Sequence, residues 1–297
     1  MRPILAALLS ATLLAAPAHA QQHGAHSAHQ GHGAMHGHDH AADPAAFLRQ
    51  HGEALSGAIN HPTRSEDRAR DPYRNPAETL AFWQVAPDMK VGEYAPGGGW
   101  FSRLLGHYLG GEGELVGLFF STDITADAAA QERLRAAAAK FPADVAGFTG
   151  LPADRFAAYT LDAVPTAEKG TFDRIIVPRM MHNLVQRGIA DTELAAMREL
   201  LKDDGMIGVE QHRARADAPD AYADGGKGYL RQADVVALME RNGFRLVGTS
   251  EVNANPRDTA DHAEGVWEMP PVLRTKRDDL RNLGESDRMT LLFMKRP

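Results

Sequence analysis

The alternation of strand-like and helix-like segments between residues 90 and 295 is the feature that most constrains the fold. Short apolar runs alternate with longer amphipathic segments, a pattern typical of a parallel sheet covered by helices on both faces. The sequence predicts strands at residues 90–95, 114–120, 157–161, 172–177, 206–211, 244–252 and 288–295. It predicts helices between them at residues 100–109, 125–140, 191–202 and 231–242. We therefore expect a doubly wound α/β domain with a seven-stranded sheet and helices on both faces.

The two ends of this pattern depart from strict alternation. No helix is predicted between the last two strands, and a strand without a helical crossover can lie antiparallel to the one before it. We therefore expect a mostly parallel sheet with an antiparallel last strand. The intervening residues 253–287 are rich in Pro, Asp and Asn, and loops of such length are commonly functional. At the other end, residues 45–59 and 77–85 predict accessory helices, with Pro76 at a first helical turn.

A glycine-rich turn, Val91-Gly92-Glu93-Tyr94-Ala95-Pro96-Gly97-Gly98-Gly99-Trp100, joins the first strand to the next helix. Glycine lets the backbone take angles that side chains disfavour and approach a ligand closely. In an open α/β sheet, ligands lie beyond the carboxyl ends of the strands. The turn resembles the first motif of class I S-adenosylmethionine-dependent methyltransferases, with Glu93, Ala95, Gly97 and Gly99 in the motif positions. Ala95 departs from the usual first glycine.

Two later stretches extend the resemblance to nearly all of residues 70–297. Leu200-Leu201-Lys202-Asp203-Asp204-Gly205 is similar to the turn before the fifth strand in that superfamily. Glu251 to Asp258, with Asp261-His262, Gly265-Val266-Trp267 and Pro270-Pro271, resembles a signature of predicted, signal-bearing bacterial methyltransferases. The resemblance implies a Rossmann-like methyltransferase fold, an antiparallel last strand and S-adenosylmethionine as cofactor. It does not imply a particular methyl acceptor.

Residues 1–20 have the features of a secretory signal. Arg2 is basic, residues 4–16 are apolar, and Ala18-His19-Ala20 is a small-residue cleavage site. We expect a mature chain that starts near Gln21 and is periplasmic or secreted. The apolar run is shorter than the roughly 20 residues a membrane-spanning helix needs. With no cysteine, neither lipidation of a cysteine nor a disulfide is available, so the core must supply stability.

Residues 21–45 form a His-rich segment ahead of the domain expected at residues 46–297. Such a composition cannot build a core, so we expect disorder. Neutral imidazoles are good ligands for transition metals, and loose metal binding is one interpretation. The alternative is a linker of biased composition. No fixed geometry is expected to hold a catalytic metal there.

Charge and missing motifs exclude several other function classes. The formal net charge is -7, without a basic block, which disfavours nucleic acid and anionic membranes as partners. No Gly-Lys-Ser or Gly-Lys-Thr follows the glycine turn, and no Gly-x-Ser-x-Gly occurs. P-loop nucleotide hydrolysis and common serine hydrolysis are therefore disfavoured.

The resemblance implies further cofactor contacts from acidic residues. Glu93 would hold backbone amides of the turn or a cofactor amino group, or it caps the turn. An acid after the second strand usually binds the ribose hydroxyls; Asp123 comes a few residues late and could instead cap the helix near Thr125. Asp162 ends the third strand, where the superfamily often binds the adenine amino group, and is otherwise a loop carboxylate.

Three polar residues that follow strands four and five are candidates for catalysis. His182 and Asn183 follow the fourth strand, where this fold usually brings cofactor and substrate together, and His212 ends the fifth. Histidine can accept a proton near neutral pH. The alternative is a satisfied structural residue in each case. Tyr229 and His262 are weaker candidates from flanking loops.

Three functions remain open at this point. The first is S-adenosylmethionine-dependent methyl transfer to a small molecule or an envelope component. Export would separate such an enzyme from its cytosolic cofactor. The second is a non-catalytic module that binds a metabolite, or a metal through the His-rich segment. The third is an NAD-linked oxidoreductase, because Ser102 stands where the dinucleotide pattern has its third glycine; an antiparallel last strand would argue against it.

Overall fold

The computed structural model describes residues 43–296. The predicted secretory signal and the histidines of the His-rich segment lie outside these residues. The first described helix, α1, spans Pro44–Ile59 and begins one residue earlier than expected, because the Asp43 carboxylate caps it by accepting from the Ala46 amide.

A seven-stranded sheet forms the centre of the described part, in the order β3-β2-β1-β4-β5-β7-β6. The strands are β1 Lys90–Tyr94, β2 Glu114–Phe119, β3 Ala157–Thr160, β4 Phe172–Pro178, β5 Leu201–His212, β6 Phe244–Ser250 and β7 Arg288–Lys295. β1 to β5 pair in parallel, whereas β7 lies antiparallel between β5 and β6. The predicted fold class, including the antiparallel last strand, is confirmed. The order reverses between β1 and β4, and such a switch point is where α/β sheets bind ligands.

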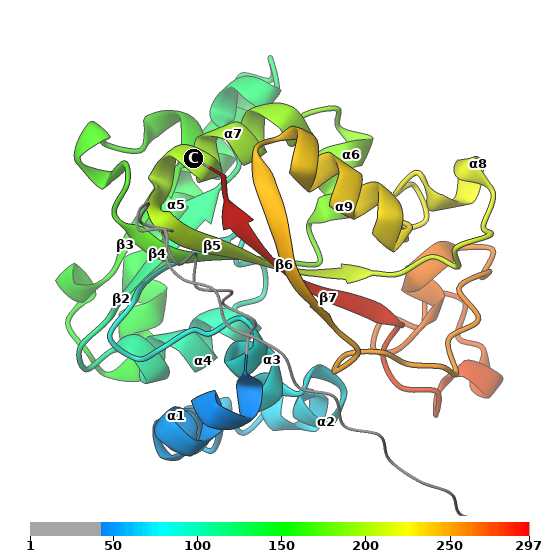
Figure 1. Cartoon of the computed structure of the whole chain (residues 1–297), viewed down its shortest axis with the longest axis horizontal. Helices are drawn as coiled ribbons and strands as arrows, with labels where there is room; N and C mark the ends of the chain where they lie inside the picture. The colour runs from blue at the N-terminus through cyan, green and yellow to red at the C-terminus, as the bar shows by residue number, and fades with distance from the viewer. Residues whose placement is uncertain (1–42, 297) are drawn as a thin grey trace, which may run out of the picture. The chain divides into compact units, whose positions relative to one another are not determined.

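Helices cover both faces of the sheet (Figure 1). On one face lie α1, α3 (Pro76–Phe82), α4 (Trp100–Leu109) and α5 (Ala128–Thr149). On the other lie α6 (Met181–Gln186), α7 (Ala190–Leu200) and α9 (Gln232–Arg241). Each face has its own apolar core, because the side chains of a strand alternate between the two faces. Two short helices, α2 (Asp71–Arg74) and α8 (Asp220–Ala223), lie in the connecting segments.

The predicted bounds of two elements are wrong for identifiable reasons. α5 begins at Ala128, where the Asp127 carboxylate caps it, and continues through Pro142 to Thr149 instead of ending at residue 140. Phe141 and Val145 are buried against the sheet on either side of that proline, and this packing outweighs the lost backbone hydrogen bond. β5 begins at Leu201 instead of residue 206, because Leu201 pairs with Phe172 before an irregularity in the ladder.

Residues 253–287, expected to form a long loop, are ordered around one buried carboxylate. Asp258, which is 8% exposed, accepts hydrogen bonds from the Tyr229 hydroxyl and the amides of Ala260 and Asp287, at 2.8–2.9 Å. His262 lies 2.9 Å from the same carboxylate through Nε2. Burial opposes ionisation of Asp258, but the hydrogen bond from His262 and the others keep its pKa below the usual value. Tyr229 and His262, weaker catalytic candidates, therefore hold this segment in place.

No helix within residues 43–296 has the length and apolarity needed to cross a membrane. In the same residues, no three His, Asp or Glu side chains are grouped so that they could hold a metal ion.

Candidate functional site

The glycine turn after β1 takes an unusual backbone path. Ala95, Gly97 and Gly99 all have left-handed φ angles, of 49°, 58° and 75°. Left-handed angles are uncommon for residues with a Cβ, and strain of this kind is concentrated at functional sites. Gly99 caps α4, and a Cβ added there would lie 3.1 Å from Arg103 Nη1. The turn thus places the N-terminus of α4 at the carboxyl edge of the sheet, where its free amides favour negative charge.

Two cavities flank this turn. The α4–α5 cavity, of about 400 Å³, lies between the turn and α5 and is lined by Ser102, Phe119, Lys140, Phe141, Asp144 and Phe148, among others. The arginine cavity, of about 200 Å³, lies on the other side and is lined by Arg70, Arg74, Arg103, Arg179, Asp67 and Glu93, among others. Pro96, Gly97 and Gly98 line both cavities.

Glu93 lies beneath the turn and is 1% exposed. Its carboxyl accepts a 2.6 Å hydrogen bond from Ser102 Oγ, which attaches α4 to β1. Burial raises the pKa of Glu93 to about 8, although the hydrogen bond from Ser102 opposes the shift. The carboxyl is therefore mostly protonated at pH 7. The hydrogen-bond donor to Glu93 is thus a side chain of α4 instead of a backbone amide of the turn. Glu93 also lines the arginine cavity.

The acids predicted after β2 and β3 lie outside the two cavities. β2 ends at Phe119, which lines the α4–α5 cavity and contacts Phe141 edge to face at 6.1 Å. Asp123 is exposed on the next turn. The alternative in which it caps the next helix is wrong, because Asp127 has that role. Asp162 accepts a 2.5 Å hydrogen bond from Thr122 Oγ1 and so joins the loops after β2 and β3.

A buried carboxylate that the sequence did not indicate joins the same strand ends. Glu193 of α7 is fully buried and accepts a 2.6 Å hydrogen bond from the Tyr94 hydroxyl. It also accepts a 3.1 Å hydrogen bond from the Ser121 amide. Burial raises the pKa of Glu193, against the effect of these hydrogen bonds. A carboxylate on the apolar face of the helix predicted at residues 191–202 is the signal that could have indicated Glu193.

The structure brings the three predicted catalytic residues together. His182 and Asn183 lie in the first turn of α6, and the His182 ring is 5.8 Å from the His212 ring. Asn183 Nδ2 lies 2.9 Å from His182 Nε2, and Gln211 Oε1 lies 3.3 Å from His182 Nδ1. These partners favour the tautomer that carries its proton on Nδ1. None of the three lines either cavity beside the turn.

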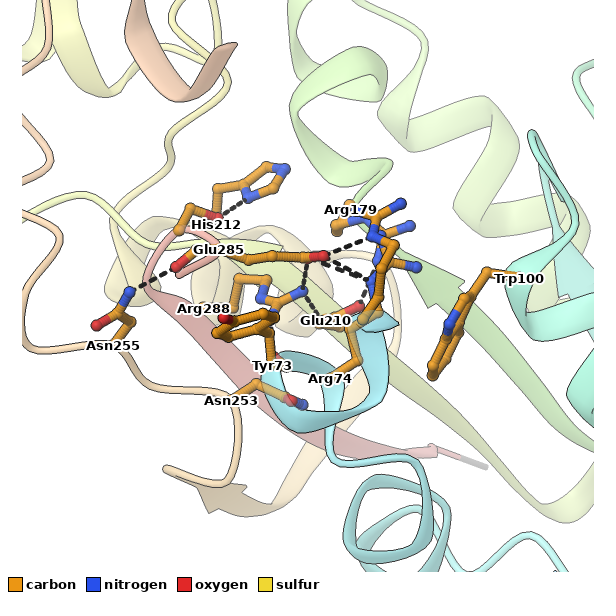
Figure 2. Close-up of polar contacts among 12 residues, drawn as sticks. Tyr73, Arg74, Trp100, Arg179, Glu210, His212, Asn253, Asn255, Glu285 and Arg288 are labelled. Atoms are coloured by element: carbon orange, nitrogen blue, oxygen red, sulfur yellow. Dashed lines mark hydrogen bonds and ion pairs between the residues drawn. The ribbon is translucent and has the colours of Figure 1, made fainter. Parts of the chain in front are cut away.

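His212 differs from His182 in how its nitrogens are used. Its Nδ1 lies 2.6 Å from Ser286 Oγ (Figure 2), whereas its Nε2 has no hydrogen-bond partner among residues 43–296. Burial lowers the pKa of both imidazoles, and His212 falls well below the usual value. A proton on His182, and then the positive charge of Arg179, would further disfavour a charge on His212. Both rings are therefore neutral at pH 7.

A network of arginines and carboxylates begins at Arg288, the ladder partner of His212, and extends to Arg70, Arg74 and Arg179 of the arginine cavity. Arg288, the first residue of β7, donates to Glu285 at 3.0 Å and pairs with Glu210 of β5 at 2.9 Å (Figure 2). Arg179 follows β4 with a left-handed φ of 56° and donates to Glu210 at 3.3 Å. Figure 2 places Arg74, from the N-terminal residues, beside the same carboxylates.

Glu285 holds the N-terminal residues against the sheet. Arg70 donates to it at 2.6 Å and Arg74 at 3.2 Å. The Arg74 guanidinium also lies 4.8 Å from the centre of the Trp100 ring. The position of Arg179 directly after β4 is a signal that the sequence offered. Nothing in the sequence pattern of residues 67–74 indicates that Arg70 and Arg74 reach this site.

No family model matches the chain, and no curated protein matches it in sequence. In three dimensions it is similar to an S-adenosylmethionine-dependent methyltransferase from Aquifex aeolicus, at 14% identity and a TM-score of 0.47, with 85% of this chain and 98% of that chain covered. It is also similar to a putative sarcosine dimethylglycine methyltransferase from Galdieria sulphuraria, at 13% identity and a TM-score of 0.46, with 84% of this chain and 98% of that chain covered.

A third similar structure is the 1,6-didemethyltoxoflavin-N1-methyltransferase of Burkholderia thailandensis with bound S-adenosylhomocysteine. It gives 14% identity and a TM-score of 0.45, with 85% of this chain and 89% of that chain covered. The fold class rests on the strand order, with β7 inserted antiparallel between β5 and β6, which is the order of the Rossmann-like methyltransferase fold.

Proposed function

We propose that this protein catalyses methyl transfer from S-adenosylmethionine to a small-molecule or envelope acceptor. The observation that carries the proposal is the glycine turn, whose left-handed Ala95, Gly97 and Gly99 open α4 between two cavities. The turn lies at the switch point of a sheet with an antiparallel β7. Dinucleotide-binding sheets of the 3-2-1-4-5-6 order lack this insertion, which disfavours the NAD-linked alternative.

The residues of the α4–α5 cavity fit such a cofactor. Phe119, Phe141 and Phe148 offer apolar ring surfaces on which a nucleobase can pack. Asp144, paired with Lys140, is the carboxylate in this lining that can accept hydrogen bonds from ribose hydroxyls. The turn's amides suit a carboxylate. When bound, the cofactor supplies a methyl group on a positively charged sulfur.

Alignment of the acceptor is the main requirement on the protein, because that methyl group is already activated. Where the acceptor must lose a proton, His212 Nε2 is the ring nitrogen of the pair without a partner among residues 43–296, while Ser286 lies at Nδ1. Burial lowers the pKa of this imidazole, which makes it a weak base, and it lines neither cavity beside the turn. His182 Nε2 already interacts with Asn183, so we assign to these two residues the positioning of the neighbouring His212 ring.

One observation favours a second candidate, a non-catalytic binding module. β2 ends at an aromatic side chain, Phe119, where the resemblance implies an acidic residue. A module of this kind would bind an anionic metabolite, or a metal through the His-rich segment. Micromolar metal binding that is lost when residues 21–42 are deleted, without any cofactor binding, would favour it.

Calorimetric titration of the full chain with S-adenosylmethionine and S-adenosylhomocysteine tests the proposal. We expect binding that Gly97→Asp weakens at least tenfold, because the new carboxylate repels the cofactor's own carboxylate at the α4 N-terminus. Gly170→Asp is the matched control, since Gly170 also has a left-handed φ, of 70°, and open space around it. Absence of binding to the unmodified chain would reject methyl transfer and leave the binding module.

We further propose that the protein is exported, on the strength of the features of residues 1–20. Fractionation of cells that express the full chain tests this, and recovery in the cytosolic fraction alone would contradict it. Export would require a supply of cofactor outside the cytosol, so the location of the chain bears directly on its activity.

A further inference from the structure

The arginine cavity adjoins a cluster with too few carboxylates for its cations. Four arginines, Arg70, Arg74, Arg179 and Arg288, share two carboxylates, Glu210 and Glu285. Buried charges are normally paired, because an uncompensated charge loses its hydration. The cluster therefore has an excess of positive charge beside open space.

The other acids of the cavity do not offset this excess. Asp67 is already held by Arg103, whose Nε and Nη2 donate to its two oxygens at 2.5 and 2.6 Å. Glu93 is mostly protonated at pH 7 because burial raises its pKa to about 8.

One buried donor in the lining has no partner among residues 43–296. The Arg74 side chain is 3% exposed, and its Nη1 makes no hydrogen bond to these residues. A buried donor left without a partner destabilises the structure, so the site favours a ligand that can accept from it. Burial, followed by the charge of Arg179, lowers the pKa of Arg74 to about 9, so the guanidinium remains charged at pH 7. An anion in the cavity would offset the charge of this cluster.

The backbone strain lies at the same place. Ala95 and Arg179 are residues with a Cβ and left-handed φ angles, and both line the arginine cavity, one after β1 and one after β4. Arg179 is 24% exposed, and its single ion pair, to Glu210, leaves Nε and Nη2 without partners among residues 43–296. A guanidinium in this state can bind an oxyanion through two parallel hydrogen bonds.

We propose that the arginine cavity binds a carboxylate or phosphate group of the acceptor, so that the substrate is an anionic molecule. This inference rests on the proposed methyl transfer. The cavity volume of about 200 Å³ is below the roughly 300–1,000 Å³ of whole-ligand pockets, which suits one charged group. The larger α4–α5 cavity, across the glycine turn, remains for the cofactor.

Titration of the full chain with inorganic phosphate and with malonate at pH 7.5, in low salt with a chelator, tests the anion site. We expect saturable binding at one site, which Arg179→Gln weakens at least tenfold. Arg70→Gln, at a residue that is 34% exposed, should weaken it severalfold. Arg245→Gln is the control, because Arg245 is exposed on the edge strand β6. This substitution removes the same charge and should leave the affinity for phosphate unchanged. No binding, or binding that Arg179→Gln leaves unchanged, would overturn the proposal.

Repeating the titration with saturating S-adenosylhomocysteine identifies the source of the anion. Unchanged phosphate affinity supports a site for the acceptor. Displacement of phosphate assigns the cavity to the cofactor's carboxylate and overturns the proposal. If phosphate binds while the cofactor product does not, the proposed methyl transfer fails and the anion site stands.

Discussion

At the scale of single residues, burial changes the chemistry of side chains that look ordinary in the sequence. Glu93 and Glu193 are both buried, and both have raised pKa values. Each carboxyl fastens a helix to the strand ends, through Ser102 in one case and Tyr94 in the other. A protonated or strongly hydrogen-bonded carboxyl is the form that such an environment permits.

The raised pKa of Glu93 predicts a loss of stability in base. The pKa in the folded state is about 8 against an ordinary value of 4.5. The folded state therefore holds the proton more tightly, and the stabilisation, on the order of a few kcal/mol, is complete below pH 4.5 and lost as pH rises through 8. Glu93→Gln keeps a hydrogen-bond acceptor for Ser102 and should remove this dependence.

Urea unfolding between pH 6 and 9 measures the effect. The Glu93→Gln chain should gain stability relative to the unmodified chain as pH rises. Glu240→Gln is a control at a half-exposed carboxylate of α9. Parallel pH profiles for the unmodified chain and Glu93→Gln would show that the carboxyl is ionised throughout.

At the scale of elements, the connecting segments contribute a small core and ion pairs of their own to the fold. Residues 253–287 contain two short 3-10 helices and otherwise irregular backbone. A small core of Ala214, Ala218, Ala223, Tyr229, Ala260 and Val266 lies between this segment and the one after β5. Glu285, near the end of the segment, then reaches Arg70 and Arg74.

Asp258→Asn tests whether one carboxylate organises this segment. An amide cannot accept all the hydrogen bonds that the carboxylate accepts, and its partners are buried. We expect a loss of about 2–4 kcal/mol in the free energy of unfolding and faster proteolysis within residues 253–287. Asp261→Asn is the control, because Asp261 is exposed and, within residues 43–296, accepts a side-chain hydrogen bond only from Thr259. Equal losses in the two variants would contradict the assignment.

At the scale of the whole molecule, the residues before the sheet are an integral part of the site. Leu55 and Ala58 of α1 are buried in the core that covers one face. Asp67, Arg70 and Arg74 then line the arginine cavity. Accessory helices were expected at residues 45–59 and 77–85, and the segment between these two ranges forms one wall of the cavity.

The stacked pair of His61 and His107 predicts that the N-terminal residues lose stability in acid. The rings of His61 and His107 stack with centres 3.6 Å apart, and Thr63 Oγ1 lies within 2.9 Å of a nitrogen of each. Burial, then the charges of His61 and Arg64, lowers the pKa of His107 from 6.5 to about 4. The unfolded chain therefore binds the proton first, and stability is lost as pH falls from 6.5 towards 4.

Unfolding free energies between pH 4 and 7 check this prediction. We expect the His107 contribution to be on the order of 1 kcal/mol, after allowance for the solvent that screens a partly exposed ring. His107→Gln should flatten the pH profile, whereas His51→Gln, on α1, should leave it unchanged. A profile that His107→Gln does not alter would assign the acid sensitivity to other groups.

The sequence by itself determined the order and type of the elements of the sheet. Alternating apolar runs, the glycine turn and the missing last crossover are local patterns, and local backbone preferences carry them directly. They predicted the seven strands, the antiparallel last strand and the glycine turn at Gly97. They also indicated His182 and His212 as candidate residues, and the structure places their rings side by side.

Only the tertiary structure decided which charged side chains meet at that switch point. Arg74 and Glu285 are 211 positions apart in the sequence, yet they form an ion pair. No periodicity records such a pair, because each partner occupies an ordinary local position and the contact depends on how distant segments pack. Burial has the same origin, so the sequence named Glu93 but could not indicate its protonation, the partners of Glu193, or the arginine cavity.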